Sequence, residues 1–194
     1  MKLAIIKYNA GNIQSVSFAL ERLGVDFSIT DNAEEIQKAD KVIFPGVGEA
    51  STTMKYLRDK KLDQVIVNLK QPVLGICLGM QLMCKHSEEN DTDCLGIFNE
   101  EVKRFIPQGN MKVPHMGWNN LTISDSWLTP ELENKYAYFV HSYYVPVNAN
   151  TSAITDYLNP FSAAMHKDNF YAVQFHPEKS AQAGELVLKS FLNV

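Results

Sequence analysis

A cysteine stands directly after an apolar run and between two glycines. The run 73–76 leads into Cys77, with Gly75 two residues before the cysteine and Gly79 two residues after it. Small residues at these places permit the sharp turn of a nucleophile elbow, in which a strand ends and a helix begins at the nucleophile. The N-terminal end of such a helix favours a thiolate over a thiol. The alternative interpretation is a buried cysteine at a tight strand-to-helix turn.

A histidine, a proline and a glutamate follow a second apolar run. Residues 172–175 lead into His176, Pro177 and Glu178. His176 can accept the thiol proton of Cys77 and return it to a leaving amine, and Glu178 can hold the imidazole in the required tautomer. Alone, this sequence is also typical of a turn before a helix. Together with Cys77 it predicts a catalytic triad for acyl transfer.

Acyl transfer also needs hydrogen-bond donors for the oxyanion. The backbone N–H of Leu78, directly after the nucleophile, is the first candidate. The second is the N–H of Val47, in a Pro-Gly-Val-Gly turn at 45–48 that follows the apolar run 42–44. Its glycines would allow a peptide to turn toward a substrate carbonyl. The same residues also fit a plain turn between a strand and a helix.

The elements that must position these residues alternate in the first half of the chain. Strands are expected near 3–6, 25–29, 41–44 and 72–76, with helices between them, which predicts βαβ units and a parallel sheet. The first of these helices should begin after Asn12 as N-cap and stop at Gly24, and a helix over 78–86 should follow the cysteine.

In the second half the pattern changes to strands, followed by one last helix near 181–192. We expect these strands to extend the same sheet. They are predicted at 113–123, 138–145, 153–157, 161–166 and 170–175.

Length and composition limit the class of protein. A chain of 194 residues predicts a single domain over 1–194. The net charge of −4 argues against a nucleic-acid partner. The apolar run at the N-terminus is too short for a signal peptide or a membrane span, so a cytoplasmic protein with no membrane partner is expected. The three cysteines, at 77, 84 and 94, fit neither a disulfide framework nor a zinc site, and neither a metal nor a cofactor is expected.

The blocks Gly-Ile-Cys-Leu-Gly-Met-Gln around Cys77 and Phe-His-Pro-Glu at His176 resemble the class I, triad-type glutamine amidotransferases. That family implies a flavodoxin-like α/β fold, with a central, mostly parallel sheet, flanking helices and an antiparallel extension. Further segments resemble the glutaminase subunits of imidazole glycerol phosphate synthases, which act in histidine biosynthesis. These segments are 8–12, 45–48, 113–119 and 138–145.

The resemblance implies that glutamine is hydrolysed to glutamate and ammonia. The ammonia would pass to a separate (β/α)₈-barrel cyclase subunit, which makes imidazole glycerol phosphate and an aminoimidazole carboxamide ribotide. A sealed path keeps ammonia unprotonated and reactive. The chain has no P-loop or dinucleotide fingerprint, which fits phosphate binding by the partner. The resemblance also implies that the chain has little glutaminase activity before the cyclase and its ligand bind. The turn 45–48 would then be the switch.

The resemblance further assigns residues to the substrate and to the partner. Contacts to glutamine are implied for Gln81, Glu89, Ser142 and Tyr143, the last two through backbone groups. A place near the cyclase interface is implied for Asn9, Asn12, Trp118 and Lys179.

Each of these roles has a structural alternative. Glu89 also fits one more charge in a solvated acidic loop over 87–93, residues 141–143 also fit an ordinary strand end, and Trp118 also fits a core aromatic. No convincing ligand geometry is expected for the histidines at 86, 115 and 166, which are interpreted as structural or surface residues.

Three other functions remain compatible with parts of the sequence. A glutaminase of the same class could feed a different synthase, and the segment 114–119 with Lys179 would then match another partner. A non-catalytic binding module could keep the fold, although packing does not require Cys77, His176 and Glu178 together. A thiol protease would cleave peptides without any partner.

Overall fold

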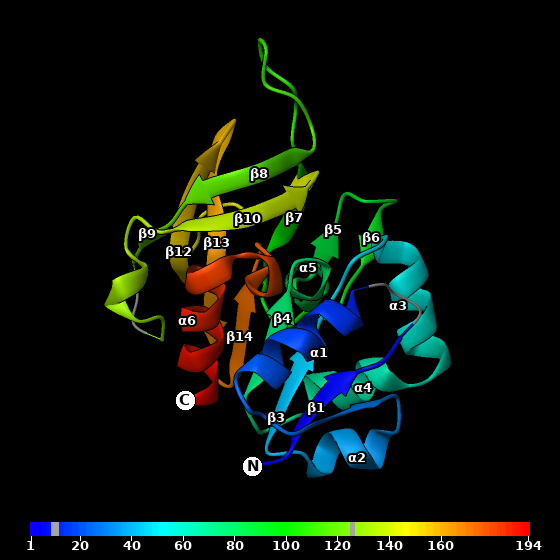
Figure 1. Cartoon of the computed structure of the whole chain (residues 1–194). Coiled ribbons are helices and arrows are strands. Elements are labelled where there is room, and N and C mark those ends of the chain that lie inside the picture. The colour runs from blue at the N-terminus through cyan, green and yellow to red at the C-terminus, as the bar shows by residue number, and fades with distance from the viewer. Residues whose placement is uncertain (9–11, 125–126) are drawn as a thin grey trace.

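The computed structural model describes residues 1–8, 12–124 and 127–194, and a twisted sheet forms its centre (Figure 1). The strand order is β2-β1-β3-β4-β14-β13-β12-β9, parallel from β2 to β14 and antiparallel beyond. The parallel strands are β1 (Leu3–Ile6), β2 (Phe27–Thr30), β3 (Lys41–Phe44), β4 (Val73–Ile76) and β14 (Phe170–Val173). The antiparallel strands are β13 (Asn159–Lys167), β12 (Thr151–Tyr157) and β9 (Thr122–Ile123).

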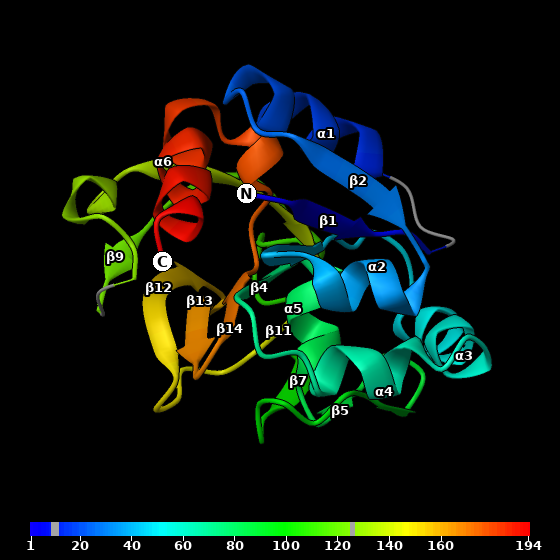
Figure 2. The same ribbon diagram turned by 90° about the horizontal axis from the view of Figure 1, so that it is seen from below.

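Helices cover both faces of this sheet because its strands are apolar on both sides. Leu3 and Ile5 of β1 pack with α1 and α6, whereas Ala4 and Ile6 pack with α2 to α5. Figure 2 shows α1 and α6 on one side of the sheet and the other helices on the opposite side. The helices are α1 (Ile13–Arg22), α2 (Ala33–Lys38), α3 (Ala50–Asp59), α4 (Leu62–Val67), α5 (Leu78–Met83) and α6 (Ala181–Leu192).

The predicted extension of the sheet is correct for β9, β12, β13 and β14 and wrong for two other strands. β8 (His115–Asn120) and β10 (Tyr136–His141) pair only with each other, antiparallel, as a separate ribbon. This ribbon crosses β12 and β13 (Figure 1). It packs face to face, with the Phe139 ring 5.7 Å from the Phe161 ring, so it covers the sheet instead of widening it.

A small third sheet lies beside the carboxyl end of β4. Its order is β11-β7-β5-β6, with β11 (Tyr143–Tyr144), β7 (Glu101–Arg104), β5 (His86–Ser87) and β6 (Thr92–Asp93). The predicted helix over 78–86 is therefore shorter than expected, since α5 ends at Met83 and the chain enters β5. Short 3₁₀ helices occur at Pro130–Leu132 and Pro177–Lys179.

The predicted limits of α1 are correct, since the helix begins after Asn12 as N-cap and stops before Gly24. Gly24 follows the helix with φ of +68°, as expected for a helix stop. Asn12 precedes the helix but its side chain does not cap it, because the amide group binds Glu178 instead. In the part of the chain that the structure describes, no helix has the length and apolar character needed to cross a membrane.

Candidate active site

The strand, turn and helix predicted around Cys77 are present. β4 ends at Ile76, α5 begins at Leu78, and Cys77 between them has φ of 53° and ψ of −107°. Such a backbone conformation is strained for a residue with a side chain. The glycine at 79 is required by close packing, because a Cβ there would lie 2.0 Å from the carbonyl oxygen of Phe44. The sequence therefore presents the sulfur at the carboxyl edge of the sheet.

The second block reaches the same edge because β14 is the direct neighbour of β4. Val173 pairs with Ile76, so His176 and Cys77 leave adjacent parallel strands at the same end. Nδ1 of His176 lies 2.8 Å from Oε1 of Glu178, and both side chains are 1% exposed. The amide group of Asn12 donates to the same carboxylate oxygen. Since a carboxylate only accepts, Nδ1 of His176 carries a hydrogen and Nε2 is left for Cys77.

The surroundings of His176 favour its charged form. Burial alone would lower the pKa of the imidazole, but Cys77 and Glu178 outweigh burial and raise the pKa to about 10. A positive imidazolium beside the sulfur stabilises a thiolate, the form of cysteine that attacks carbonyl carbons.

A cavity of about 310 Å³ opens beside the sulfur of Cys77. The turn after β3, the start of α5, the β5–β6 hairpin and the segment after β10 all contribute to its wall. The lining includes five of the residues implied to bind substrate or oxyanion, and these are Val47, Gln81, Glu89, Ser142 and Tyr143. The alternative of an ordinary strand end for 141–143 does not explain why Ser142 and Tyr143 line the same cavity as Cys77.

The two candidate oxyanion donors do not point to one place. The backbone N–H of Leu78 donates to the carbonyl oxygen of Gly46, with an N to O distance of 3.3 Å. In a trans peptide the carbonyl and the following N–H point in opposite directions, so the N–H of Val47 points away from that of Leu78. The hydroxyl of Tyr8 also holds this turn, by donating to the carbonyl oxygen of Pro45.

Glu89 is not a solvated charge of a loop. Its carboxylate accepts from the backbone N–H of Ala50, at 2.8 Å and at the start of α3. Burial raises the pKa of this carboxyl group. The loop predicted to be exposed is exposed at residues 88, 90, 91 and 93, whereas Ser87 and Thr92 are buried in the β5–β6 hairpin.

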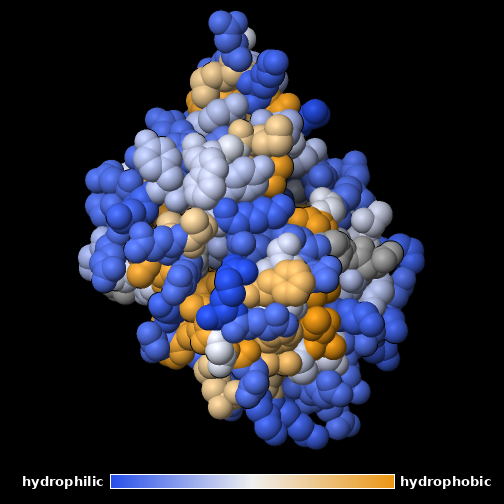
Figure 3. Space-filling view, in the orientation of Figure 1, coloured by the Kyte–Doolittle hydropathy of each residue, from blue (hydrophilic) through white to orange (hydrophobic). Residues whose placement is uncertain are grey.

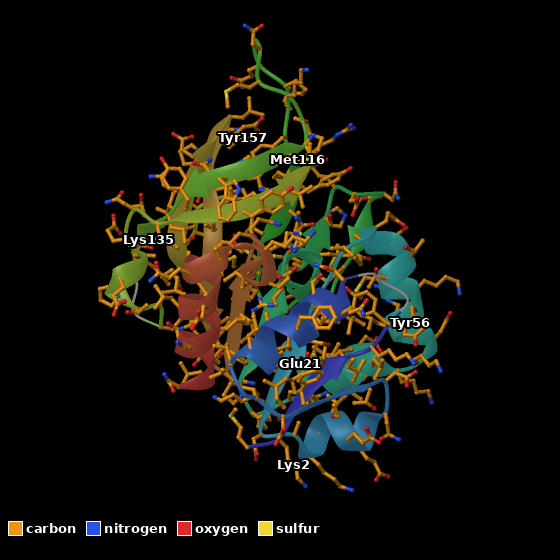
Figure 4. All side chains as sticks on the ribbon, in the orientation of Figure 1. Lys2, Glu21, Tyr56, Met116, Lys135 and Tyr157 are labelled. Atoms are coloured by element: carbon orange, nitrogen blue, oxygen red, sulfur yellow. The ribbon has the colours of Figure 1, made fainter. Side chains whose placement is uncertain are left out.

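Two of the residues implied to lie near a partner, Trp118 and Lys179, lie on and beside the β8–β10 ribbon. Trp118 is 53% exposed, so the core alternative is wrong for this side chain. Its ring lies 5.9 Å from that of Tyr138, and the Lys179 ammonium lies 6.0 Å from the same Tyr138 ring. In Figure 3 pale, weakly polar side chains gather over this ribbon, and Met116, labelled in Figure 4, lies at its edge. Asn9 lies outside the described residues.

Sequence reasoning missed Gln174, which touches the nucleophile. Its side chain is fully buried, and its amide nitrogen lies 3.6 Å from the sulfur of Cys77. Its amide oxygen accepts from Gln81 at 3.0 Å. A polar residue between Val173 and Phe175, inside an apolar run, was the available signal.

No metal site emerges from the described part of the chain, where no three His, Cys, Asp or Glu side chains are grouped as ligands. The cysteines at 77, 84 and 94 are unpaired. Burial raises the pKa of the Cys94 thiol to about 12 and that of the Cys84 thiol well above its usual value, so both remain thiols.

A strand-end cysteine with a cavity beside its sulfur, next to a buried histidine and carboxylate, fits the triad class of glutamine amidotransferases. The model of the family "Glutamine amidotransferase class-I" matches residues 4–193, and the chain belongs to this family.

Relatives narrow the comparison. The chain is 62% identical over 196 residues to "Imidazole glycerol phosphate synthase subunit HisH" of Bacteroides thetaiotaomicron, covering 100% of both chains. It is 44% identical to the protein of the same name from Idiomarina loihiensis, covering 100% of this chain and 98% of the relative.

Solved structures share the fold at low sequence identity. One described as a glutamine amidotransferase has a TM-score of 0.76 at 17% identity, covering 98% of this chain and 97% of the other. The structure of PurLQS from Thermotoga maritima has a TM-score of 0.71 at 16% identity, covering 99% and 97%. These likenesses support the α/β fold with a mostly parallel sheet.

Proposed function

We propose that this chain is the glutaminase subunit of an imidazole glycerol phosphate synthase and hydrolyses the side-chain amide of glutamine. The observation that carries the proposal is that Cys77 and the His176–Glu178 pair leave two adjacent parallel strands at the same edge of the sheet, with a cavity beside the sulfur. Full-length identity of 62% to a subunit of that synthase supports the choice of synthase. The match of the family model to residues 4–193 supports one glutamine amidotransferase domain over 1–194.

The reaction begins with the thiolate of Cys77 and the imidazolium of His176. The sulfur attacks the amide carbon of glutamine, and the tetrahedral oxyanion is bound by the N–H groups of Leu78 and Val47. Nε2 of His176 gives its proton to the amide nitrogen, and the C–N bond breaks to release ammonia and a thioester. Neutral His176 then takes a proton from water, and the hydroxide attacks the thioester. The C–S bond breaks, which releases glutamate and restores the ion pair.

Substrate contacts follow from the wall of the cavity. Gln81 and Glu89 face the bound glutamine, and the backbone groups of Ser142 and Tyr143 hold its amino-acid end. The carboxylate of Glu89 provides the negative charge that an α-ammonium group requires. Asn12 keeps Glu178 in place, and so acts on the triad as well as lying near the proposed interface.

The resting turn at 45–48 supports the proposal that the subunit has little activity alone. With the Gly46 carbonyl directed at the Leu78 N–H, an oxyanion at that point meets an acceptor in place of a second donor. Rotation of the Gly46–Val47 peptide exchanges the carbonyl for the N–H. We therefore assign the switch to this peptide, with the binding of the cyclase and its ligand favouring the rotated state.

The partner is a (β/α)₈-barrel cyclase subunit that forms a heterodimer with this chain. Ammonia passes to it through a closed channel, because ammonium in water is not a nucleophile. The Trp118, Tyr138 and Lys179 cluster belongs to the contact surface. The pair works in the cytoplasm, where a catalytic thiol stays reduced.

The decisive measurement is glutamate release from glutamine by the chain alone and with the cyclase subunit plus its nucleotide ligand. We expect stimulation of at least about 100-fold, since one oxyanion donor contributes on the order of 10²–10³ in turnover. Cys77→Ala should abolish the stimulated activity.

Other outcomes separate the alternatives. Cys77-dependent activity that the cyclase does not change would keep the chemistry and assign another synthase. Cleavage of peptides without a partner would indicate a thiol protease, and no activity in any mixture would indicate a binding module.

A further inference from the structure

Two buried histidines touch each other beside the substrate cavity. Nδ1 of His115, on β8, lies 3.0 Å from Nε2 of His141, at the end of β10. Nδ1 of His141 lies 2.7 Å from the carbonyl oxygen of Tyr143. Nε2 of His115 lies 3.4 Å from the amide nitrogen of Asn119. The hydrolytic steps above use neither imidazole.

The direction of each hydrogen bond in the series from Asn119 through the two histidines to Tyr143 can be assigned. The carbonyl oxygen of Tyr143 only accepts, so Nδ1 of His141 carries the hydrogen. A neutral imidazole has a single N–H, so Nε2 of His141 accepts and Nδ1 of His115 donates. Asn119 accepts the Asn120 N–H through its oxygen, which leaves its nitrogen to donate to His115. All the contacts are satisfied together when both rings are neutral Nδ1–H tautomers.

The packing around the rings keeps them neutral. His115 is stacked between the rings of Phe139, at 4.8 Å, and Tyr157, at 4.0 Å. Burial lowers the pKa of His115 to about 4. Burial lowers the pKa of His141 to about 3, with His115 and His176 acting in the same direction and the hydrogen bond to Tyr143 acting against it. A second proton on either ring would place two N–H groups face to face.

The hydrogen-bonded chain continues to the nucleophile. The carbonyl oxygen of Tyr143 also accepts from the amide of Gln81, at 2.9 Å. The same amide nitrogen donates to Gln174, which in turn lies 3.6 Å from the sulfur of Cys77. An unbroken series of contacts therefore links the exposed strand β8 with the sulfur. The carbonyl oxygen of Tyr143 joins the two parts of this series, because it accepts from both His141 and Gln81.

We propose that His115 and His141 are positioning residues for glutamine. As fixed Nδ1–H tautomers they hold the Tyr143 carbonyl, and with it the backbone of 141–143 that lines the cavity beside Cys77. The inference rests on the proposed glutaminase function and deepens it. Neither ring touches the reacting atoms. Their contribution is to hold the binding segment in the one arrangement that accepts the amino-acid end of the substrate.

The first test compares two replacements of His115 in the complex with the cyclase and its ligand. His115→Phe keeps an aromatic ring in the stack and removes the donor, which leaves the buried Nε2 of His141 unpaired. We expect a KM for glutamine raised about tenfold, with kcat changed by less than about threefold. His115→Asn keeps an N–H near the position of Nδ1 and should restore KM to within about threefold of wild type.

A purely structural role would give a different result. Loss of folded protein lowers the apparent kcat and leaves KM unchanged. His166→Phe is the matched control, because His166 stacks on Tyr171 at 4.4 Å and takes no part in the chain to Tyr143. Its KM should equal that of wild type.

The second test uses the wild-type protein and therefore does not depend on the folding of any variant. A long-range ¹H–¹⁵N correlation spectrum of the isolated chain at pH 7 should show two neutral histidines protonated at Nδ1. An Nε2–H tautomer or a charged ring at either position would overturn the inference. So would a wild-type KM in His115→Phe while the wild-type complex releases glutamate. A wild-type complex without glutamate release would instead overturn the proposed function, and this inference with it.

Discussion

Two buried imidazoles of this molecule have opposite electrical surroundings. His176 faces a sulfur and a carboxylate, and these raise its pKa to about 10 in spite of burial. His141 faces a carbonyl oxygen and two other imidazoles, and burial lowers its pKa to about 3. Burial has the same sign in both cases, so the partners alone decide which ring carries the charge. The different neighbours of His176 and His141 therefore suit the two rings to the different roles proposed for them.

The lowered pKa values predict how stability depends on pH. In the unfolded chain His115 and His141 bind protons below about pH 6.5, whereas in the folded chain His115 does so only below about pH 4 and His141 only below about pH 3. Their contribution is present above pH 6.5 and is lost as the pH falls from 6.5 toward 4. Urea unfolding between pH 7 and pH 4.5 should show this loss, and His115→Phe should make the slope shallower by about 1 kcal/mol per pH unit.

Carboxyl groups also titrate in part of this range, so the difference between wild type and variant is the quantity to use. Equal slopes for wild type and His115→Phe would mean that His115 is already charged in the folded protein near neutral pH.

At the scale of elements, the approach of α5 to β3 controls the elbow. A Cβ on Gly79 would lie 2.0 Å from the Phe44 carbonyl oxygen, which is backbone and cannot move without shifting β3. We expect Gly79→Ala to lower the free energy of unfolding by at least about 2 kcal/mol and to displace Cys77. Chemical denaturation and glutamate release measure the two effects.

Gly96→Ala is the control for that substitution. Gly96 has φ of +70° with no atom within 4 Å of an added Cβ, so its substitution adds backbone strain without a clash. Its cost should be about 1 kcal/mol, with glutaminase activity retained. Equal losses in the two variants would show that close packing at 79 is not the cause.

Sequence patterns could predict those elements that are determined by residues close to one another in the sequence. Gly75 and Gly79 indicated the elbow, and the apolar runs before Cys77 and His176 indicated strands that end at one edge. The ribbon formed by β8 and β10 could not be predicted, because alternation shows which face of a strand is buried and not what covers that face. Asn12 was correctly predicted as the N-cap of α1. The hydrogen bond from its side chain to Glu178 could not be predicted, because Glu178 is distant in sequence.

The histidine pair shows the same limit at the site. Residues 115 and 141 lie on strands whose pairing sets His115 opposite His141, and a register shifted by one residue would separate them. The sequences of β8 and β10 alone do not predict this register of pairing. Gln174 gave a weak signal as a polar residue in an apolar run, but its contact with Cys77 depends on the order of strands in the sheet.

At the scale of the whole molecule, the exposed aromatic cluster of the ribbon predicts a binding surface. Trp118→Ala should weaken binding of the cyclase subunit roughly 30-fold, as expected for a central aromatic of an interface. Isothermal titration calorimetry measures the Kd directly. The free energy of unfolding of the isolated chain should change little, because the side chain is 53% exposed.

Ile29→Ala provides the comparison on another face. Ile29 is 46% exposed and lies on β2, at the opposite end of the sheet order from β9. Its replacement should leave the Kd unchanged. Equal affinity of the Trp118→Ala variant and wild type would place the cyclase elsewhere on the molecule.

The position of β14 between β4 and β13 also determines when the central sheet can be completed during synthesis of the chain. Residues 170–173 enter the middle of the sheet, so β4 keeps an open edge until they have left the ribosome. The same residues lead into His176, which follows Cys77 by about a hundred positions in translation. A growing chain therefore exposes a nucleophile without its base, and the sheet and the triad are completed in one late event. Premature release would yield a protein that neither folds fully nor consumes glutamine.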